Sequence, residues 1–250
     1  MNYFFNKNGP LISTYFIIAI VFWLIFLIII PQLYMLDLSF RPNLPPLLRG
    51  GPDDVHTLEH YRYFIFGSET NEDPYNYVDL GVFYNTFLTA IFVTILNLCF
   101  CYPIAFFMAK VATPKTSRLL IVSLIIPFWI NELLRSFALR IIFAGEGVIN
   151  NILLGTGLID TGINFIAADI ALYTGLTYAY ILLMIFPLYN AIESLDTNQL
   201  EAAKDLGSST LRTHWRIVIP HAKAGIASGC TMVFMLTAGA LATPVVLSSP

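Results

Sequence analysis

Five long apolar stretches, separated by polar connections, divide the chain. A helix needs roughly 20 apolar residues to cross the hydrocarbon core of a bilayer. The stretches 11–36, 82–109, 119–143, 165–189 and 224–247 all reach this length. The first is too long for the apolar region of a cleaved signal and no A-x-A site follows it, so we interpret it as an uncleaved span. The pattern predicts an all-α, polytopic membrane protein, with residues 1–250 forming a single transmembrane domain.

The composition agrees with lipid as the solvent. Hydrophobic residues make up 57% of the chain and charged residues only 12%, against about 25% charged in soluble domains. The net charge of −3 offers no basic surface for nucleic acid. The cysteines all lie in apolar stretches and are interpreted as packing residues. His56 and His60 share a predicted helical face, but two ligands do not make a metal site, so none is predicted.

The charges between the spans predict the orientation of the chain. The second connection carries Lys110, Lys115 and Arg118 without an acid, and the fourth carries four further basic residues. The first connection instead holds eight acidic residues against three arginines. Because cytoplasmic loops are enriched in Lys and Arg, we expect an inner-membrane protein with a cytoplasmic N-terminus. Residues 37–81 then form an outer loop, and the fourth connection is cytoplasmic.

The fourth connection, residues 194–220, is too polar to span and too regular for a linker. Asp196 is a good helix N-cap, with Gln199 three residues later as a capping-box partner. Gly207 suits the left-handed residue that ends a helix, and Ser208, Ser209 and Thr210 offer caps for a second helix. The segment therefore predicts a helix–turn–helix on the cytoplasmic face, attached directly to the fifth span.

This segment resembles the EAA loop of ABC importer permeases. The matching positions are Glu201, Ala202, Ala203, Gly207, Ile217 and Pro220, with Ile219 where the family usually has Leu. The resemblance implies a coupling element that docks into a cytoplasmic ATP-binding subunit. Glu201 would contact the ATPase, Gly207 would allow the turn, and Ala202 and Ala203 would permit close packing. The chain has no phosphate-binding loop motif, so ATP would be bound by the partner and no cofactor by this chain.

A second resemblance is to spermidine/putrescine-type permeases. It is carried by residues 127–138 (PFWINELLRSFA), by Gly147, Asn150 and Gly157-Leu158, and by residues 239–244 (GALATP). It implies a type I ABC importer permease fold, a second permease subunit and a periplasmic substrate-binding protein as partners. The family normally has six spans, so the resemblance leads us to expect that this sequence lacks the sixth.

Several polar residues fall inside the predicted spans, where ionisable groups are costly and point to function. Glu132 and Arg135 stand three residues apart, close enough to pair on a helix. Asp169, Tyr173, Thr177 and Tyr180 share one predicted helical face. We expect these residues to line the translocation path. The alternatives are an internal ion pair that fixes helix packing and a simple packing stripe.

Other features of the spans predict packing. Gly225 and Gly229 form a G-x-x-x-G pair that favours close helix contact, and Pro127 and Pro187 are expected to kink their helices.

These patterns favour a transport subunit over an enzyme. The best prediction is a permease that passes a polyamine such as spermidine or putrescine from a periplasmic binding protein to the cytoplasm. Another small solute, such as an amino-acid derivative, an anion or chelated iron, stays open. An ion-coupled secondary transporter would explain the charged residues in the spans but not residues 194–220. A membrane enzyme would need a nucleophile–base pair or a metal cluster, and the spans offer neither.

Overall fold

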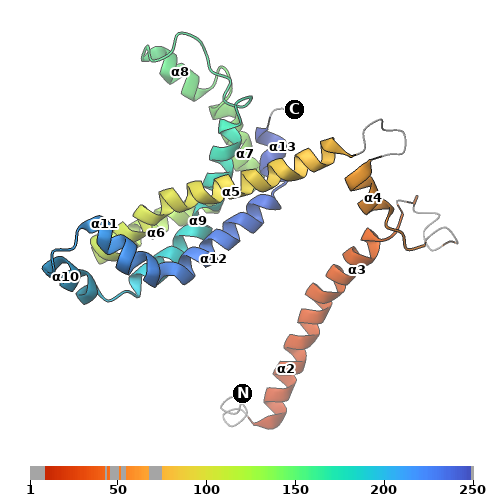
Figure 1. Ribbon diagram of the computed structural model, residues 1–250, viewed down its shortest axis with the longest axis horizontal. Helices are drawn as coiled ribbons and strands as arrows, with labels where there is room; N and C mark the ends of the chain where they lie inside the picture. Colours follow the sequence, from red (N-terminus) through yellow and green to blue (C-terminus); the bar gives the residue numbers. More distant parts are fainter. Residues whose placement is uncertain (1–8, 43, 46–50, 52–54, 68–74, 249–250) are drawn as a thin grey trace. The chain divides into compact units, whose positions relative to one another are not determined.

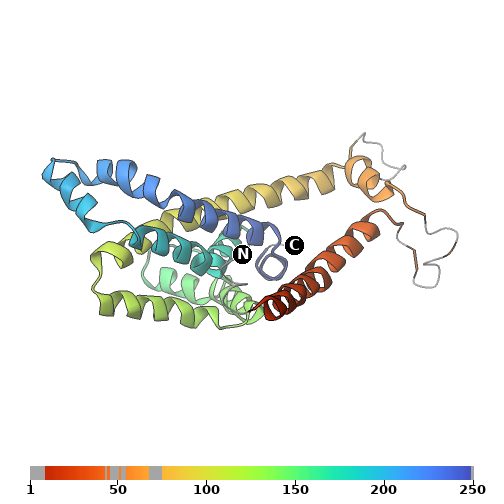
Figure 2. The same ribbon diagram turned by 90° about the horizontal axis from the view of Figure 1, so that it is seen from below.

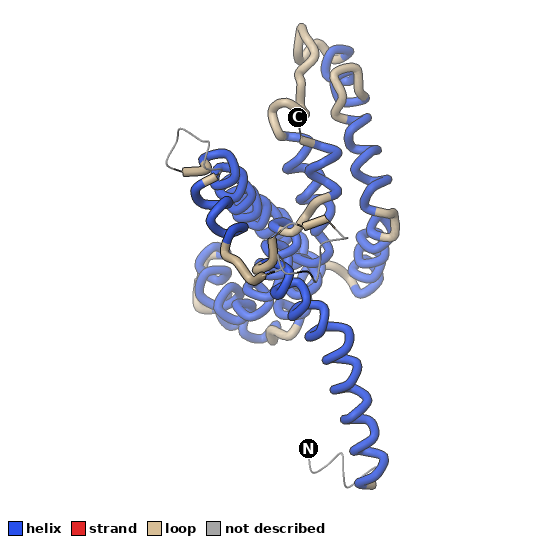
Figure 3. The backbone as a smooth tube through the Cα atoms, turned by 90° about the vertical axis from the view of Figure 1, so that its right-hand side faces the viewer, coloured by secondary structure: helices blue, strands red, loops and turns tan. Residues whose placement is uncertain are grey.

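The computed structural model describes residues 9–42, 44–45, 51, 55–67 and 75–248. All regular structure in these residues is helical (Figure 3). The backbone forms two compact units, residues 1–83 and 84–250 (Figure 1).

The first unit is dominated by one long apolar helix. It consists of α2 (Pro10–Leu24), a π-helical turn η1 (Ile25–Ile29) and α3 (Ile30–Ser39). Among its described side chains only Ser13 is buried. Large apolar side chains exposed along a whole helix are typical of a span whose partners are lipid or other helices.

A polar network follows this helix and joins it to the short helix α4 (Glu59–Phe66). Asp37 accepts hydrogen bonds from Arg41 Nε (2.7 Å) and pairs with His56 Nε2 (2.9 Å). His60 Nε2 bonds instead to the carbonyl oxygen of Arg41 at 2.8 Å. The two histidines therefore have separate partners. Within the described part of the chain, no group of three or more metal-ligating side chains forms.

The second unit is a helical bundle built around α9. Its helices are α5 (Tyr77–Phe106, which begins in the first unit), η2 (Phe107–Val111), α6 (Pro114–Phe128), α7 (Glu132–Ile142), α8 (Val148–Gly155), α9 (Ile170–Glu193), α10 (Thr197–Asp205), α11 (Thr210–Thr213), η3 (His214–Val218), α12 (Ile219–Ala238) and α13 (Ala242–Leu247). Figures 1 and 2 place α10 and α11 at one end of this unit and α7 and α13 at the other.

The described residues contain four helices long and apolar enough to cross a membrane, or five if one bent pair forms a single span. The four are Leu11–Ser39, Tyr77–Val111, Ile170–Glu193 and Thr210–Ala238. The predicted third span differs from the structure, because α6 and α7 meet at an angle of 91°. Asn131 causes the new start, since its side chain accepts a hydrogen bond from Leu133 N (2.9 Å) and caps α7.

The predicted fifth span also differs in its bounds. Its helix begins at Thr210, well before residue 224, and ends at Ala238. The remaining predicted residues form the separate short helix α13.

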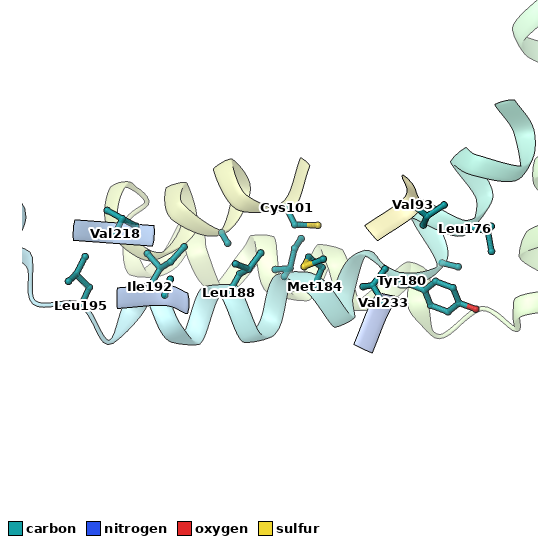
Figure 4. Close-up of a cluster of buried hydrophobic side chains, with 14 residues drawn as sticks. Val93, Cys101, Leu176, Tyr180, Met184, Leu188, Ile192, Leu195, Val218 and Val233 are labelled. Atoms are coloured by element: carbon teal, nitrogen blue, oxygen red, sulfur yellow. The ribbon is translucent and has the colours of Figure 1, made fainter. Parts of the chain in front are cut away.

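The hydrophobic core follows the length of α9 (Figure 4). Leu176, Met184, Leu188 and Ile192 are almost completely buried there. Side chains from other elements complete the cluster, among them Val93 and Cys101 of α5, Leu195, Val218 of η3 and Val233 of α12. The three cysteines are free; Cys101 is a packing residue as expected, whereas Cys99 is exposed.

The predicted close contact at Gly225 and Gly229 is confirmed. Both glycines are buried where α12 crosses α9. A Cβ atom on Gly225 would lie 2.5 Å from both Ala191 Cβ and Pro187 O, and one on Gly229 would lie 2.8 Å from Met184 Sδ. Small residues let the two backbones approach, which is how helices gain packing energy in a membrane.

Candidate functional site

The segment 194–220 folds as the predicted helix–turn–helix. Asp196 caps α10, with its side chain accepting a hydrogen bond from Asn198 N at 3.0 Å. No bond from the Gln199 side chain back to Asp196 is present, so the capping box is only half formed. Ser209 Oγ caps α11 by accepting from Arg212 N at 3.4 Å.

The turn between the two helices requires Gly207. Its φ of 75° lies in the left-handed region, which glycine adopts without steric cost. The N–H of Ser208 donates to Ala203 O and the N–H of Gly207 donates to Lys204 O, both at 2.9 Å. These two bonds make a Schellman motif, which satisfies the last carbonyl groups of α10.

The second helix of this segment is continuous with a span. α11, η3 and α12 follow one another without a break from Thr210 to Ala238. Ile217 is partly buried against the core cluster, and Pro220 is the second residue of α12, just after the π-helical turn η3. The second helix of the segment and a membrane-length helix are therefore one continuous element.

Several side chains of this segment are exposed, among them three large apolar ones. Glu201 and Ala202 are exposed and Ala203 is half-buried. Leu206 is 88% exposed, Leu211 73% and Trp215 66%. Exposed apolar side chains of this size on a polar helix pair are typical of a protein-binding surface.

A second group of polar residues lies at the break between α6 and α7. Glu132 Oε1 accepts a hydrogen bond from Thr243 Oγ1 at 3.0 Å, and Ser136 Oγ lies 3.3 Å from the same hydroxyl. Arg135 is only 9% exposed, and its guanidinium carbon lies 5.5 Å from the ring centroid of Tyr178. We call Glu132, Arg135, Ser136, Tyr178 and Thr243 the polar cluster.

The alternative interpretation of Glu132 and Arg135, an internal ion pair, is not what the structure shows. Both residues are described, and no contact within salt-bridge distance joins them. The carboxylate of Glu132 turns toward α13 and the guanidinium of Arg135 toward α9. Arg135 also borders a small cavity of about 80 Å³ between α6, α7 and α9.

The predicted stripe on the fourth span is only partly formed. Asp169 precedes α9 and has a left-handed backbone with φ 56°, so it leaves the helical face. Tyr173 packs edge-on against Phe92 at 4.9 Å, and Tyr180 is buried in the core cluster. Thr177 Oγ1 is buried without a hydrogen-bond partner. These contacts favour packing for the two tyrosines.

Sequence reasoning missed three members of the polar cluster. Ser136 and Thr243 fall within residues 127–138 and 239–244, which carry the resemblance described above. No sequence pattern indicated that their hydroxyl groups would contact each other. Tyr178 follows Thr177 directly and lies just off the predicted stripe. Only the packing of α7 against α9 and α13 brings the three together.

Comparison with known proteins identifies the family. Residues 80–249 match the family described as "Binding-protein-dependent transport system inner membrane component". The spermidine/putrescine transport system permease protein PotB of Haemophilus influenzae is 34% identical over 223 residues, which cover 89% of this chain and 73% of that protein. PotB of Escherichia coli strain K12 is 36% identical over 229 residues, covering 89% of this chain and 76% of that protein.

A solved structure supports the same fold. It is described as the crystal structure of a bacterial ABC transporter involved in the import of the acidic polysaccharide alginate, and it matches with a TM-score of 0.65. The match covers 98% of this chain and 79% of that chain, at 17% sequence identity. At this identity the likeness shows the fold alone.

These findings identify a transport subunit of the inner membrane that works with a binding protein and leaves ATP hydrolysis to separate subunits. The fold is that of a type I ABC importer permease. The chain belongs to the family of binding-protein-dependent transport system inner membrane components.

Proposed function

We propose that this chain is a permease that passes a small polycation, of the spermidine and putrescine kind, into the cytoplasm. The observation that carries the proposal is the similarity to PotB, at 34–36% identity over 89% of the chain. The substrate class is inferred from the names of those relatives. The family match over residues 80–249 covers both the polar cluster and the segment 194–220.

The polar cluster supports a cationic substrate. Glu132 offers a carboxylate at the break of a span, and among the described residues its partner is the neutral hydroxyl of Thr243 rather than a cation. An ammonium group gains a charge-assisted contact there. The nearby rings add little to this argument, because Tyr173 packs against Phe92 and the guanidinium of Arg135 lies over the ring of Tyr178. A single weak contact suits passage, since a tight site would trap the substrate.

Arg135 favours the competing hypothesis of an anionic substrate. Its guanidinium is buried and, in the described part of the chain, makes no hydrogen bond to an acceptor side chain. It would attract an anion and repel a cation. Arg140 contributes less to this hypothesis, because its Nη1 donates a hydrogen bond to the carbonyl oxygen of Val246.

The segment 194–220 is assigned to coupling. In this proposal Glu201, Ala202 and Ala203 contact an ATP-binding subunit, Gly207 sets the turn, and Ile217 and Pro220 join the element to its span. A second permease subunit completes the pathway, and a periplasmic binding protein delivers the substrate to the outer face. The N-terminus and this segment are cytoplasmic, and residues 37–81 lie outside.

The test is uptake by the complete transporter. The chain is reconstituted in proteoliposomes with its own second permease, ATP-binding subunits and binding protein, and labelled spermidine, putrescine and sulfate are compared. ATP-dependent uptake of a polyamine alone supports the proposal. Uptake of sulfate but not of either polyamine contradicts the substrate class, and uptake of any solute without ATP contradicts the importer mechanism.

A further inference from the structure

Three side chains near the C-terminal end of the second span, Tyr77–Val111, contact the segment 194–220 in its N-terminal and C-terminal parts. They are Tyr102, Phe106 and Lys110, which follow one another at intervals of four residues. The first two belong to α5 and Lys110 belongs to the π-helical turn η2 that continues it. Residues four apart lie on one helical face, so the three form a continuous row, which we call the span-two row.

Lys110 contacts the chain at the N-terminal end of the segment. Its Nζ donates hydrogen bonds to the carbonyl oxygen of Glu193, at 3.1 Å, and to that of Leu195. Glu193 is the last residue of α9, and Leu195 immediately precedes Asp196, the N-cap of α10. A cation at a helix C-terminus satisfies free carbonyl groups and interacts favourably with the helix dipole.

Tyr102 and Phe106 contact the C-terminal part of the segment. The Tyr102 hydroxyl and His214 Nδ1 are hydrogen-bonded at 2.7 Å. The His214 ring lies 4.4 Å from the ring of Phe106 and 5.7 Å from that of Tyr102, measured between centroids. His214 is the first residue of η3, the π-helical turn that joins α11 to α12. Turns of this kind often mark functional positions in helices.

The two ends of the segment also contact each other. Ser194 Oγ and His221 Nε2 are hydrogen-bonded at 3.0 Å, and Leu195 and Val218 are buried in the same core cluster. The two arms of the segment are thus joined to each other and to one face of span two. By chain continuity α10 is connected only to α9 and, through α11 and η3, to α12.

We propose that the span-two row positions the segment 194–220 and transmits its displacement to α5, so that three spans respond together when the ATP-binding subunits close. Tyr102, Phe106 and Lys110 are positioning residues in this inference, since they act through the segment and not on the substrate. The inference rests on the coupling function proposed above for residues 194–220. Core contacts such as that of Cys101 already join α5 to α9, and the row adds the contacts that α5 makes with the segment itself.

The experiment measures uptake and ATP hydrolysis separately in proteoliposomes containing the complete transporter with its binding protein. The variants are Lys110→Met, which removes the bonds to Glu193 and Leu195, and Tyr102→Phe, which removes one hydroxyl and keeps the ring contacts. We expect each to lower the number of substrate molecules imported per ATP by about threefold or more, the effect of losing one hydrogen bond to a coupled element. Lys110→Arg keeps the charge and should restore most of the ratio.

Matched controls lie close by. Lys115→Met removes a basic residue that is exposed in the same connection, and Tyr84→Phe removes an exposed hydroxyl from the same helix. Both should leave the ratio unchanged. An unchanged ratio in Tyr102→Phe and Lys110→Met overturns the inference. So does a parallel fall of uptake and ATP hydrolysis in Tyr102→Phe, because that pattern indicates a purely structural role.

A reference variant separates this inference from the proposed coupling function. Gly207→Val disturbs the turn of the segment itself and leaves the span-two row intact. If Gly207→Val lowers the ratio and the row variants do not, only the role proposed for the span-two row is wrong. If neither class lowers it, coupling through residues 194–220 is wrong as well.

Discussion

Glu132 and Thr243 are hydrogen-bonded at 3.0 Å, although 111 positions separate them in the chain. The bond joins the first turn of α7 to the first turn of α13. Ser136, one turn further along α7, approaches the same hydroxyl, and Arg140 donates to the carbonyl oxygen of Val246. Three polar contacts therefore attach α7 to α13 along its length. The carboxylate of Glu132 is held in place by one of them.

Replacing Glu132 with Gln should slow polyamine uptake. The change removes the negative charge but keeps the size of the side chain and an acceptor for Thr243. Losing a charge-assisted contact with an ammonium group costs ~1.5–3 kcal/mol, so uptake at low substrate concentration should fall at least about tenfold. The measurement is the initial rate of spermidine uptake in proteoliposomes over a range of concentrations of loaded binding protein.

Two comparisons make this prediction specific. Glu146→Gln removes an exposed acid from the third connection and should leave uptake unchanged. Thr243→Val removes the hydroxyl that orients Glu132 but keeps the charge, so its effect should be smaller than that of Glu132→Gln. Equal uptake by Glu132→Gln and the wild type would show that the charge of Glu132 does not contact the substrate during transport.

Replacing Asn150 with Ala should destabilise the connection between α7 and α9. Asn150 is fully buried; its Nδ2 donates to Ala144 O (3.1 Å) and Ile163 O (2.8 Å), and its Oδ1 accepts from Ile163 N (2.9 Å). A buried polar group left without a partner costs ~1–3 kcal/mol. We expect a loss of ~2–4 kcal/mol in the free energy of unfolding, measured by thermal unfolding in detergent.

The neighbouring asparagine provides the control. Asn151 is exposed and its side chain donates one bond, to Glu146 O at 3.0 Å. Asn151→Ala should cost less than ~1 kcal/mol. Similar losses in the two variants would show that the buried bonds of Asn150 do not carry the stability of this connection.

Replacing Gly225 with Ala should weaken the contact between α9 and α12. The added Cβ would lie 2.5 Å from the backbone oxygen of Pro187 and 2.5 Å from Ala191 Cβ, so the two helices must move apart. Overpacking of this kind costs ~1–3 kcal/mol. Gly155→Ala is the control, since a Cβ there has no atom within 4 Å. A lower midpoint of thermal unfolding is expected for Gly225→Ala alone.

The local features of the structure were predicted best. Asp196 caps a helix, Gly207 has a left-handed backbone, and Gly225 lies at a close helix crossing. Each of these depends on the side chain or backbone of one residue and its near neighbours, so the sequence pattern contains the information. The number of apolar stretches also agrees with the four or five candidate spans.

Features that depend on packing between distant segments were not predicted. The spacing of Glu132 and Arg135 allowed an ion pair, but in the folded chain Glu132 bonds to Thr243 and Arg135 lies over the ring of Tyr178. The 91° break after α6 was equally hidden, because α6 and α7 together have the length and apolar composition of one span. Pro127 predicted a kink, and only the capping bond of Asn131 turns it into a new helix.

The proposed orientation predicts which positions react from outside the cell. In a variant without Cys99, Cys101 and Cys230, Leu58→Cys should be labelled by a membrane-impermeant maleimide in intact cells. Leu206→Cys should react only after permeabilisation. Both side chains are well exposed, at 65% and 88%, so accessibility within the fold does not limit the reaction. Position 70, at the centre of the predicted outer loop, lies outside the described residues. Labelling of Leu206→Cys alone in intact cells would reverse the topology.

Replacing Gly207 with Val should uncouple transport from ATP hydrolysis. Gly207 has φ 75°, and a Cβ there meets no atom within 4 Å, so the cost comes from the backbone alone. A left-handed conformation costs an L-residue about 1–2 kcal/mol, and more for a β-branched one. The Schellman bonds of Ser208 and Gly207 would weaken, and α10 would lose its fixed direction relative to α11.

Three variants test this reasoning. Gly207→Val should lower the substrate imported per ATP about threefold or more, with normal insertion in the membrane. Gly207→Asn should retain most of the wild-type ratio, because Asn tolerates the left-handed region better than other side chains. Gly145→Val, at a glycine with open space and no positive φ, should behave as the wild type. If Val and Asn at position 207 have the same effect, the left-handed backbone is not what the turn contributes to coupling.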